Sequence, residues 1–296
     1  MRLNTKIELC LVCGNSQVPK FEYQGYHYYQ CKLCGLVSTY PLPEEQIVAE
    51  HYSHKFVEGN YRLLQDYAEQ YKSVYQTFTE VLAQVIREQG NSLVGASILD
   101  IGCFTGEFLQ LLQTEGADVF GLELQAEAVD IANRRLAGRV YQADFFGNEF
   151  PQQEFDIITL MGVIEHVVDP VSLIQRTHQL LSREGVIMLQ TPNSGALLAR
   201  LLGKHWPPYQ PVEHIHLFSA QSLSRLLSEA GFQDIKITKH VKKLPIAYVY
   251  EMMANFGSEL RKIVTPVYRL LPRFLRNLQL RFYVGEMIVT ARKFDP

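Results

Sequence analysis

Apolar residues follow two alternating patterns along the chain from about residue 97 onward. Short apolar runs, typical of buried strands, are separated by segments in which apolar residues recur every three or four positions, as on one face of a helix. The strands expected from these runs span residues 97–101, 117–123, 140–143, 155–161, 186–191, 233–239 and 284–291. The helices expected between them span residues 106–115, 126–137, 170–181 and 219–230. This alternation predicts an α/β fold with a doubly wound, Rossmann-like, seven-stranded parallel sheet and helices on both faces.

The first 90 residues follow a different pattern. An aromatic stretch at residues 23–29 predicts a strand, and residues 44–52 predict a short helix. Apolar positions spaced by three and four over residues 61–88 predict a longer helix that covers the sheet. The expected organisation is a small module at residues 1–40, a helical connector or cap at 41–90, and a main domain at 91–296 with a helical insertion at 242–281.

Four of the five cysteines stand in two Cys-x2-Cys pairs, Cys10/Cys13 and Cys31/Cys34. This spacing is typical of a four-thiolate zinc site, because both sulfurs of one tight turn can reach the same ion. A ribbon of about 35 residues cannot build a core alone, so the metal would supply much of its folding energy. A closed site of four cysteines has no open coordination position, and we therefore expect a small zinc ribbon whose Zn²⁺ is structural.

Composition and charge narrow the class of protein. The chain is 47% apolar and 20% charged, which is ordinary for a globular protein. Its net charge of −3 disfavours a dedicated nucleic-acid binder, and no nucleic-acid partner is expected. No apolar run approaches the roughly 20 residues of a membrane-spanning helix, and the first residues carry no secretory pattern. We therefore expect a soluble, cytoplasmic protein.

Glycines and a carboxylate mark the turn after the first strand of the main domain. Gly102 and Gly106 allow a tight turn and close approach of a ligand to the backbone. A dinucleotide site would show Gly-x-Gly-x-x-Gly here, whereas these glycines have the spacing Gly-x3-Gly. Asp100 at the end of the strand would repel phosphate and tolerate a cationic ligand that has no phosphate.

Acidic residues also end the next two strands. Glu123 is placed to accept both hydroxyls of a ribose, and Asp144 to accept an adenine amino group, with Phe145 against the ring. With no Lys or Arg nearby, the three strand ends suit an adenosine that carries a positive sulfonium in place of phosphates.

These residues resemble the S-adenosylmethionine (SAM) site of class I SAM-dependent methyltransferases. Residues 99–106 (Leu-Asp-Ile-Gly-Cys-Phe-Thr-Gly) are similar to motif I, residues 121–123 to the acidic ribose loop, and residues 155–170 to the post-motif strand of that superfamily. Phe104 departs from the pattern, because the family often has a glycine there. The resemblance implies SAM as cofactor, bound by Asp100, Gly102, Cys103, Phe104, Gly106, Glu123, Leu124, Asp144, Phe145 and Met161.

Histidines supply the candidate bases. Methyl transfer to a hydroxyl or an acidic carbon requires loss of a proton, which a histidine near neutral pKa can accept. In the family the Glu-His pair that ends in His166 lies beside the donor methyl. Glu213 and His214, followed by Phe-Ser at 218–219, resemble a stretch of zinc-containing nucleotide-sugar methyltransferases. His216 is expected to face the same side of an extended segment as His214. The candidate catalytic residues are His166, His214 and Glu213.

The resemblance implies methyl transfer to a hydroxyl, or to a sugar carbon, of a small molecule such as a sugar, a glycolipid or a secondary metabolite. The nucleotide-sugar enzymes usually have an additional C-terminal domain, which has no counterpart in these residues and leaves the sugar open. An RNA methyltransferase guided by the ribbon is disfavoured, because Lys20 and Lys32 are the only Lys or Arg between Cys10 and Cys34. A nicotinamide dehydrogenase and a non-catalytic zinc scaffold are further alternatives.

Two segments on the acceptor side remain. Residues 193–211, rich in aromatics and prolines, are expected to shape an acceptor pocket. Residues 242–281 carry eight Lys or Arg against two Glu, a net charge of +6 that leaves −9 for the rest of the chain. Basic and apolar residues at helical spacing fit a lid over the cleft, a dimer contact, or a peripheral contact with anionic lipid or a lipid-linked substrate.

Overall fold

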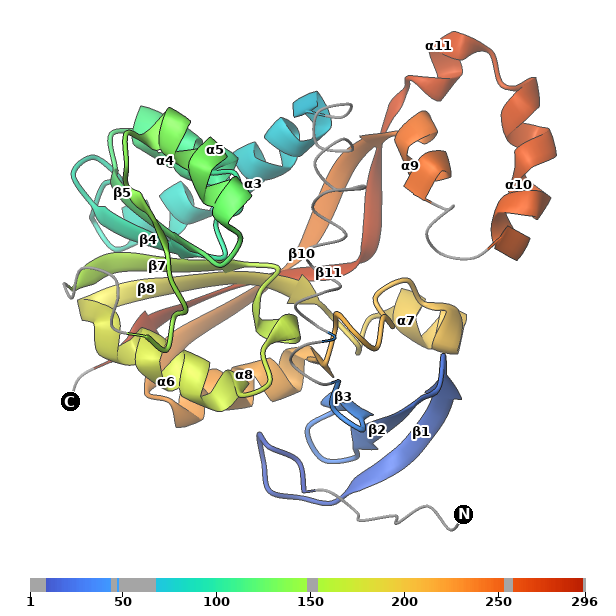
Figure 1. Cartoon of the computed structure of the whole chain (residues 1–296), viewed down its shortest axis with the longest axis horizontal. Helices are drawn as coiled ribbons and strands as arrows, with labels where there is room; N and C mark the ends of the chain where they lie inside the picture. The colour runs from blue at the N-terminus through green and yellow to red at the C-terminus, as the bar shows by residue number, and fades with distance from the viewer. Residues whose placement is uncertain (1–8, 44–46, 48–67, 148–153, 253–257, 295–296) are drawn as a thin grey trace.

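A computed structural model shows that the chain forms two sheets, one of seven strands and one of four (Figure 1). The structure describes residues 9–43, 47, 68–147, 154–252 and 258–294. Most of the helix expected at 44–52, and residues 61–67 of the longer helix, therefore lie outside the described residues.

The larger sheet has seven strands in the order β10-β11-β8-β7-β4-β5-β6. All seven expected strands are present, and the last three are longer than expected. The strands are β4 (Ser97–Ile101), β5 (Asp118–Glu123), β6 (Val140–Gln142), β7 (Phe155–Met161), β8 (Leu181–Pro192), β10 (Phe232–Pro245) and β11 (Gln279–Lys293).

The expectation of a wholly parallel sheet is wrong at one strand. The pairs among β4, β5, β6, β7 and β8 are parallel, whereas β11 runs antiparallel to both β8 and β10. The insertion explains the reversal, because it leaves the end of β10 and returns to the start of β11 at the same edge of the sheet.

Helices cover both faces of the larger sheet (Figure 1). The helices α3 (Ala68–Glu88), α4 (Glu107–Thr114) and α5 (Ala126–Leu136) lie on one face, and α6 (Pro170–Leu180) and α8 (Ala220–Glu229) on the other. Ile98 and Leu99, adjacent on β4, belong to the two separate apolar cores on these faces. None of the helices in the described ranges is long and apolar enough to span a bilayer.

The smaller sheet has four strands in the order β1-β2-β3-β9. Its strands are β1 (Gln17–Tyr23), β2 (Tyr26–Cys31), β3 (Val37–Tyr40) and β9 (His216–Leu217). The single strand expected at residues 23–29 is wrong, since the chain reverses there at Gln24 and Gly25, with φ values of 51° and 81°. Two successive positive φ angles are the signature of a tight hairpin turn.

β9 comes from the main domain, 176 residues or more beyond its partner β3 in sequence. Val37 pairs with Leu217, and Ser38 pairs with His216. The cysteine-bearing hairpins and the segment after β8 therefore form one continuous sheet.

Residues 193–211 contain two short helices and two buried aromatic side chains. Within this segment lie α7 (Leu197–Leu202) and η3 (Gly203–His205), and Trp206 and Tyr209 are buried, while its expected role beside the acceptor stays a prediction. These two aromatics pack with Tyr28 of β2, so the segment joins the small sheet to the main domain.

The insertion projects from the end of β10 and the start of β11 (Figure 1). Its helices are α9 (Ile246–Met252), α10 (Ser258–Leu270) and α11 (Arg273–Arg276), so the helical part is shorter than the expected 242–281. Residues 242–245 continue β10, and residues 279–281 belong to β11.

Candidate active site

The turn between β4 and α4 has a left-handed backbone at three positions. The φ angles are 71° at Gly102, 49° at Phe104 and 80° at Gly106. A Cβ at Gly102 would lie 2.7 Å from a methyl of Val163, and one at Gly106 would lie 3.1 Å from Cβ of Ala132. Phe104 adopts a conformation that glycine accepts without strain, which accounts for the glycine that the resembled motif often has there.

Glu123 ends β5 with its carboxylate held against this turn. One oxygen accepts from the backbone N–H of Phe104 at 3.0 Å. The other accepts from the N–H groups of Leu124 at 2.8 Å and Gln125 at 3.0 Å. Three backbone donors therefore fix the orientation of the carboxylate, which has room for further acceptance.

A cavity of about 150 Å³ opens beside Glu123 at the carboxyl edge of β4, β5 and β6. Its lining includes five residues predicted to bind the cofactor: Gly102, Glu123, Leu124, Asp144 and Phe145. It also includes residues that the sequence did not single out, among them Phe146, Val163, Val167 and Leu173. A mostly apolar cavity with carboxylates at its rim suits a flat aromatic base attached to a ribose.

Asp100, Cys103 and Met161 do not line this cavity, although all three were predicted to bind the cofactor. Asp100 is buried and accepts a 2.6 Å hydrogen bond from the hydroxyl of Thr159. Burial, followed by the charge of Glu123, raises the pKa of Asp100 to about 7. Burial also raises the pKa of Cys103 well above its usual value, so that this thiol is a neutral packing group.

His166 and His214 lie together beyond the end of β7. His166 closes the short helix η2 (Ile164–His166), and its ring centroid is 4.8 Å from that of His214. Nδ1 of His166 lies 2.7 Å from the carbonyl oxygen of Glu213, and Nδ1 of His214 lies 2.6 Å from that of Pro208. A carbonyl only accepts, so each neutral ring carries its proton on Nδ1 and its lone pair on Nε2.

Glu165 is the third residue of this cluster. It is 2% exposed, accepts from the hydroxyl of Thr191 at 2.9 Å, and lies with one oxygen 3.9 Å from Nε2 of His166. Burial raises the pKa of Glu165 to about 8. Glu165, His166 and His214 each offer a ligand atom within 4.8 Å of the others, so this group has the geometry to hold a proton or a divalent metal.

The other residues predicted around His214 have different positions. His216 has other partners than His214: it is buried, with Nδ1 3.0 Å from the hydroxyl of Ser38 and Nε2 3.2 Å from the carbonyl of Val168. Burial lowers the pKa of His216 to about 4, so it is a neutral residue that joins the two sheets. Glu213 contributes its backbone carbonyl to the site.

A buried polar network beside Met161 was missed by the sequence. Glu286 on β11 accepts from Lys242 at 2.7 Å, from Gln190 at 2.9 Å and from Nδ1 of His240 at 3.0 Å. Burial alone would raise the pKa of Glu286, but Lys242 and His240 outweigh it and lower the pKa to about 2. The pairing of β11 with β10 and with β8 brings these side chains together, and no local motif marks it.

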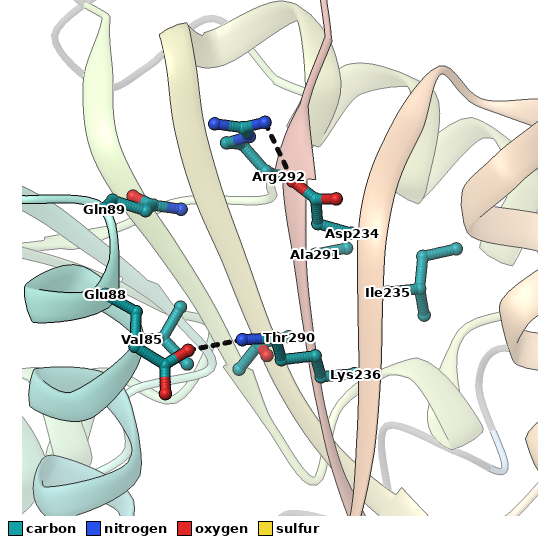
Figure 2. Close-up of a pocket in the computed structure, with 9 residues that line it drawn as sticks. All are labelled: Val85, Glu88, Gln89, Asp234, Ile235, Lys236, Thr290, Ala291 and Arg292. Carbon is teal, nitrogen blue, oxygen red and sulfur yellow. Dashed lines mark hydrogen bonds and ion pairs between the residues drawn. The ribbon is translucent and has the colours of Figure 1, made fainter.

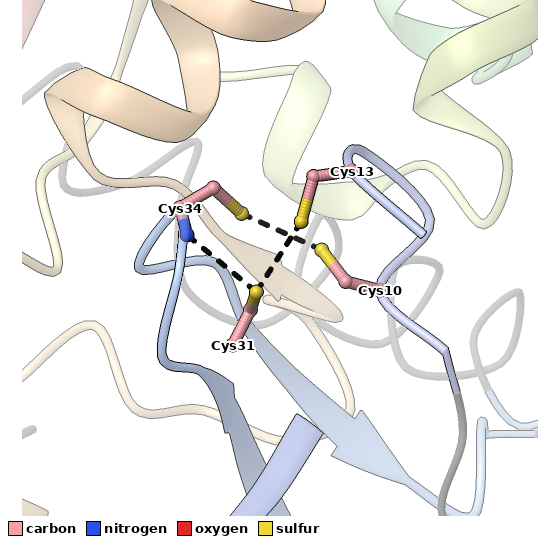
Figure 3. Close-up of side chains that lie close together, drawn as sticks. All are labelled: Cys10, Cys13, Cys31 and Cys34. Atoms are coloured by element: carbon pink, nitrogen blue, oxygen red, sulfur yellow. Dashed lines mark hydrogen bonds between the residues drawn. The ribbon is translucent and has the colours of Figure 1, made fainter. Parts of the chain in front are cut away.

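The four predicted metal ligands converge in the small sheet (Figure 3). Sγ of Cys10 lies 3.5 Å from that of Cys34, and Sγ of Cys13 lies 3.4 Å from that of Cys31. Four sulfurs placed tetrahedrally at 2.3 Å from a zinc ion would lie about 3.8 Å apart. The cluster is therefore close to the size that Zn²⁺ requires.

Hydrogen bonds join the small sheet to the segments that flank the two histidines. The hydroxyl of Ser219 donates to the carbonyl of Cys34 at 2.7 Å. The N–H of Thr39 donates to the carbonyl of Ile215 at 3.0 Å, and the N–H of Ile215 donates to the carbonyl of Glu165 at 2.8 Å. The small sheet therefore positions the segment that carries His214.

A larger hollow of about 550 Å³ lies at the opposite edge of the sheet (Figure 2). It is open, and an ion pair between Glu88 of α3 and Lys236 of β10 crosses it. In parallel α/β sheets, ligands bind at the carboxyl ends of the strands, and this hollow lies at the amino end of β8. We therefore do not assign it to the site.

Known proteins match the main domain of this chain. A family model described as a methyltransferase domain matches residues 67–237. A ubiquinone biosynthesis O-methyltransferase from Aromatoleum aromaticum is 28% identical over 177 residues, which cover 56% of this chain and 75% of that protein. A protein of the same name from Actinobacillus pleuropneumoniae is 32% identical over 118 residues, covering 36% of this chain. The chain spans about half the length of the Actinobacillus relative, with 50% covered.

Solved structures share the fold at low sequence identity. A SAM-dependent methyltransferase from Thermotoga maritima, described as a possible histamine N-methyltransferase, has a TM-score of 0.54 at 16% identity. The match covers 83% of this chain and 99% of that one. The YcgJ protein from Bacillus subtilis has a TM-score of 0.51 at 16% identity, with 72% of this chain and 98% of that one covered. These likenesses confirm the expected Rossmann-like fold of the larger sheet.

Proposed function

The chain belongs to the methyltransferase-domain family, and from this premise we propose that it transfers the methyl group of SAM to a hydroxyl of a small molecule. The observation that carries the proposal is the carboxylate of Glu123, held by three backbone donors at the mouth of a mostly apolar cavity. An adenine fits such a cavity, and a ribose places its two hydroxyls at the carboxylate.

When bound there, SAM supplies a methyl group on a positively charged sulfur. The chain's own contribution begins with Asp100 and Glu123, whose negative charges favour a cation at the turn. The left-handed turn at residues 102–106 keeps side chains away from the approaching ligand. Holding an acceptor in line with the methyl supplies much of the rate, up to about 7–11 kcal/mol in ideal cases.

We propose His166 as the base that takes the proton from the acceptor hydroxyl. Its Nδ1 hydrogen bond to the carbonyl of Glu213 sets the tautomer in which Nε2 accepts a proton. His214, 4.8 Å away between ring centroids, stands beside it as the second imidazole of the site. The names of the relatives support oxygen as the acceptor atom, and the sugar carbon is the alternative.

We also propose that Cys10, Cys13, Cys31 and Cys34 hold one structural Zn²⁺. The sulfur positions support this assignment, and the four thiolates fill every position of a tetrahedral ion. Elemental analysis of the purified chain is expected to find one zinc per polypeptide.

Calorimetric titration with SAM and with NAD tests the proposed donor. We expect SAM to bind and NAD to leave no heat of binding. In the variant Glu123→Gln we expect the Kd for SAM to rise about 100-fold, because the negative charge is lost and an NH2 group that cannot accept replaces one of the two carboxylate oxygens. The variant Glu127→Gln, an exposed position four residues later on α5, is the matched control and should bind SAM normally. NAD binding without SAM binding would contradict the proposal.

SAM affinity is expected to depend on pH through Asp100. Its pKa is raised to about 7, so the carboxyl is largely protonated below that pH. A cationic ligand favours the ionised form, and affinity should therefore fall as the pH drops below 7, by up to about tenfold per unit. Titrations at acidic and alkaline pH measure this, with the neutral thioether S-adenosylhomocysteine as the comparison ligand. A pH response that survives unchanged in Asp100→Asn would assign it to another group.

A further inference from the structure

The insertion has a small packed interior of its own. We call residues 246–281 the arm. Tyr250 of α9 stacks on Tyr268 of α10, with ring centroids 3.7 Å apart and planes 8° apart. Arg261 lies over the ring of Tyr250 at 5.0 Å, and Arg276 lies over that of Tyr268 at 4.8 Å. Aromatic and cationic side chains therefore face inward and fix α9, α10 and α11 to one another.

Large apolar side chains point outward from the same arm. The exposed fractions are 63% for Val267, 84% for Leu270, 72% for Phe274, 47% for Leu278 and 39% for Leu280. These five residues lie within 14 positions, yet they are five of the sixteen large apolar side chains exposed in the described part of the chain. Such a concentration on one element is unusual for a surface that faces only water.

Basic residues outnumber acidic ones in the arm by six to two, and the two acidic residues are Glu251 and Glu259. Residues 260–285 contain six Lys or Arg and no Asp or Glu. Arg269, Arg273 and Arg281 are exposed between the apolar side chains. Outside residues 242–281 the chain carries a net charge of −9. An anionic surface would therefore attract the arm and repel the remainder of the molecule, which fixes the orientation of approach.

We propose that the arm docks on an anionic phospholipid membrane. Leu270 and Phe274 would enter the boundary between headgroups and acyl chains, while the arginines pair with lipid phosphates. A second copy of this chain is a poorer occupant, because a two-fold contact would bring two copies of the same positive patch together. RNA is also a poorer occupant of this surface, because contacts with RNA phosphates do not require exposed Leu and Val side chains.

Sedimentation of the full chain with lipid vesicles tests the proposal. We expect binding to vesicles that contain phosphatidylglycerol and, at low salt, binding about tenfold weaker to vesicles of phosphatidylcholine alone. Raising the salt should weaken the first interaction, because exposed charges are screened. Failure to bind phosphatidylglycerol vesicles at low salt would overturn the proposal.

Two double variants separate the arm from apolar exposure in general. Leu270→Ser with Phe274→Ser should lower vesicle binding about tenfold or more, since apolar area no longer leaves water. Val94→Ser with Phe294→Ser removes side chains that are 72% and 45% exposed elsewhere and should leave binding unchanged. Equal losses in both variants would contradict the assignment. Thermal unfolding of each variant shows whether its fold is intact.

Insertion itself has a direct signal. Trp206 is the only tryptophan and is 1% exposed, so brominated lipids should not quench the fluorescence of the unmodified chain. Phe274→Trp should add emission that brominated phosphatidylglycerol quenches. If this tryptophan is not quenched, or if Leu270→Ser with Phe274→Ser instead dissociates a dimer, the arm is not a membrane surface. None of these readouts depends on methyl transfer, so the proposal can fail while the proposed function stands.

Discussion

Replacing His166 by alanine is expected to lower kcat about 10²–10⁴-fold while SAM affinity stays within about threefold of the original. The loss follows from the proposed role, because the acceptor hydroxyl would then lose its proton to water. SAM affinity should persist because the cavity beside Glu123 does not include His166. Single-turnover rates and calorimetric titration with SAM measure the two quantities separately.

Two further measurements distinguish a base from a residue that only shapes the site. Imidazole added to the His166→Ala protein should restore part of the rate, because it can occupy the vacated space and accept the proton. The acidic limb of the pH–rate profile should disappear in the variant and return with imidazole. The variant His205→Ala changes an exposed histidine on η3 and is the control that should keep full activity.

His214→Ala shows which of the two rings accepts the proton. If His166 is the base, the His214 variant should lose less activity and should keep the acidic limb of the profile. If His214→Ala loses the acidic limb of the pH–rate profile and His166→Ala keeps it, His214 is the base and His166 is not. Full activity in both variants would rule out a histidine base at this site.

Removing the proposed Zn²⁺ from the cysteine cluster is expected to lower turnover strongly while leaving the SAM site able to bind. Zinc contributes about 10–16 kcal/mol of binding free energy in small modules at neutral pH, and without it such ribbons unfold. The bonds from Ser219 to the Cys34 carbonyl and from Thr39 to the Ile215 carbonyl would then be lost. The segment that carries His214 would no longer be held against His166.

The variant Cys34→Ser and chelation of the wild-type chain should give the same result. We expect kcat to fall about 100-fold or more and the Kd for SAM to change less than about threefold, since misplacing a site by 1 Å can cost that much. Lys32→Ser is the matched control, because Lys32 is exposed between the two cysteines of its pair and offers no ligand. If chelation removes SAM binding together with turnover, the metal supports the whole fold and not the acceptor side alone.

The sequence predicted the order of strands and helices in the main domain well, because each element has a strong local pattern. Ser97–Ile101 and Phe155–Met161 match the expected strands residue by residue. One error concerns a local turn in the small sheet. The two halves of residues 23–29 both have strand-like side chains, and only the positive φ at Gln24 and Gly25 separates them.

The candidate site was predictable where its residues follow consecutive strands. Glu123 and Phe145 lie beside the same cavity because parallel strands end at one edge. The position of His216 was not predictable, because its partner Ser38 lies 178 residues away. The buried position of Glu286 was not predicted for the same reason. Its partners Lys242 and His240 are distant in sequence and reach it only across a strand pair.

The pairing of β3 with β9 limits how this chain can be rebuilt. Side chains alternate along a strand, so a slip of one residue in the pairing of β3 with β9 would exchange the faces of His216 and Leu217. A shift of one residue would thus remove an apolar contact of Leu217 and a buried hydrogen bond of His216 together. A four-cysteine module grafted from another protein would therefore have to include a strand that takes the place of β9.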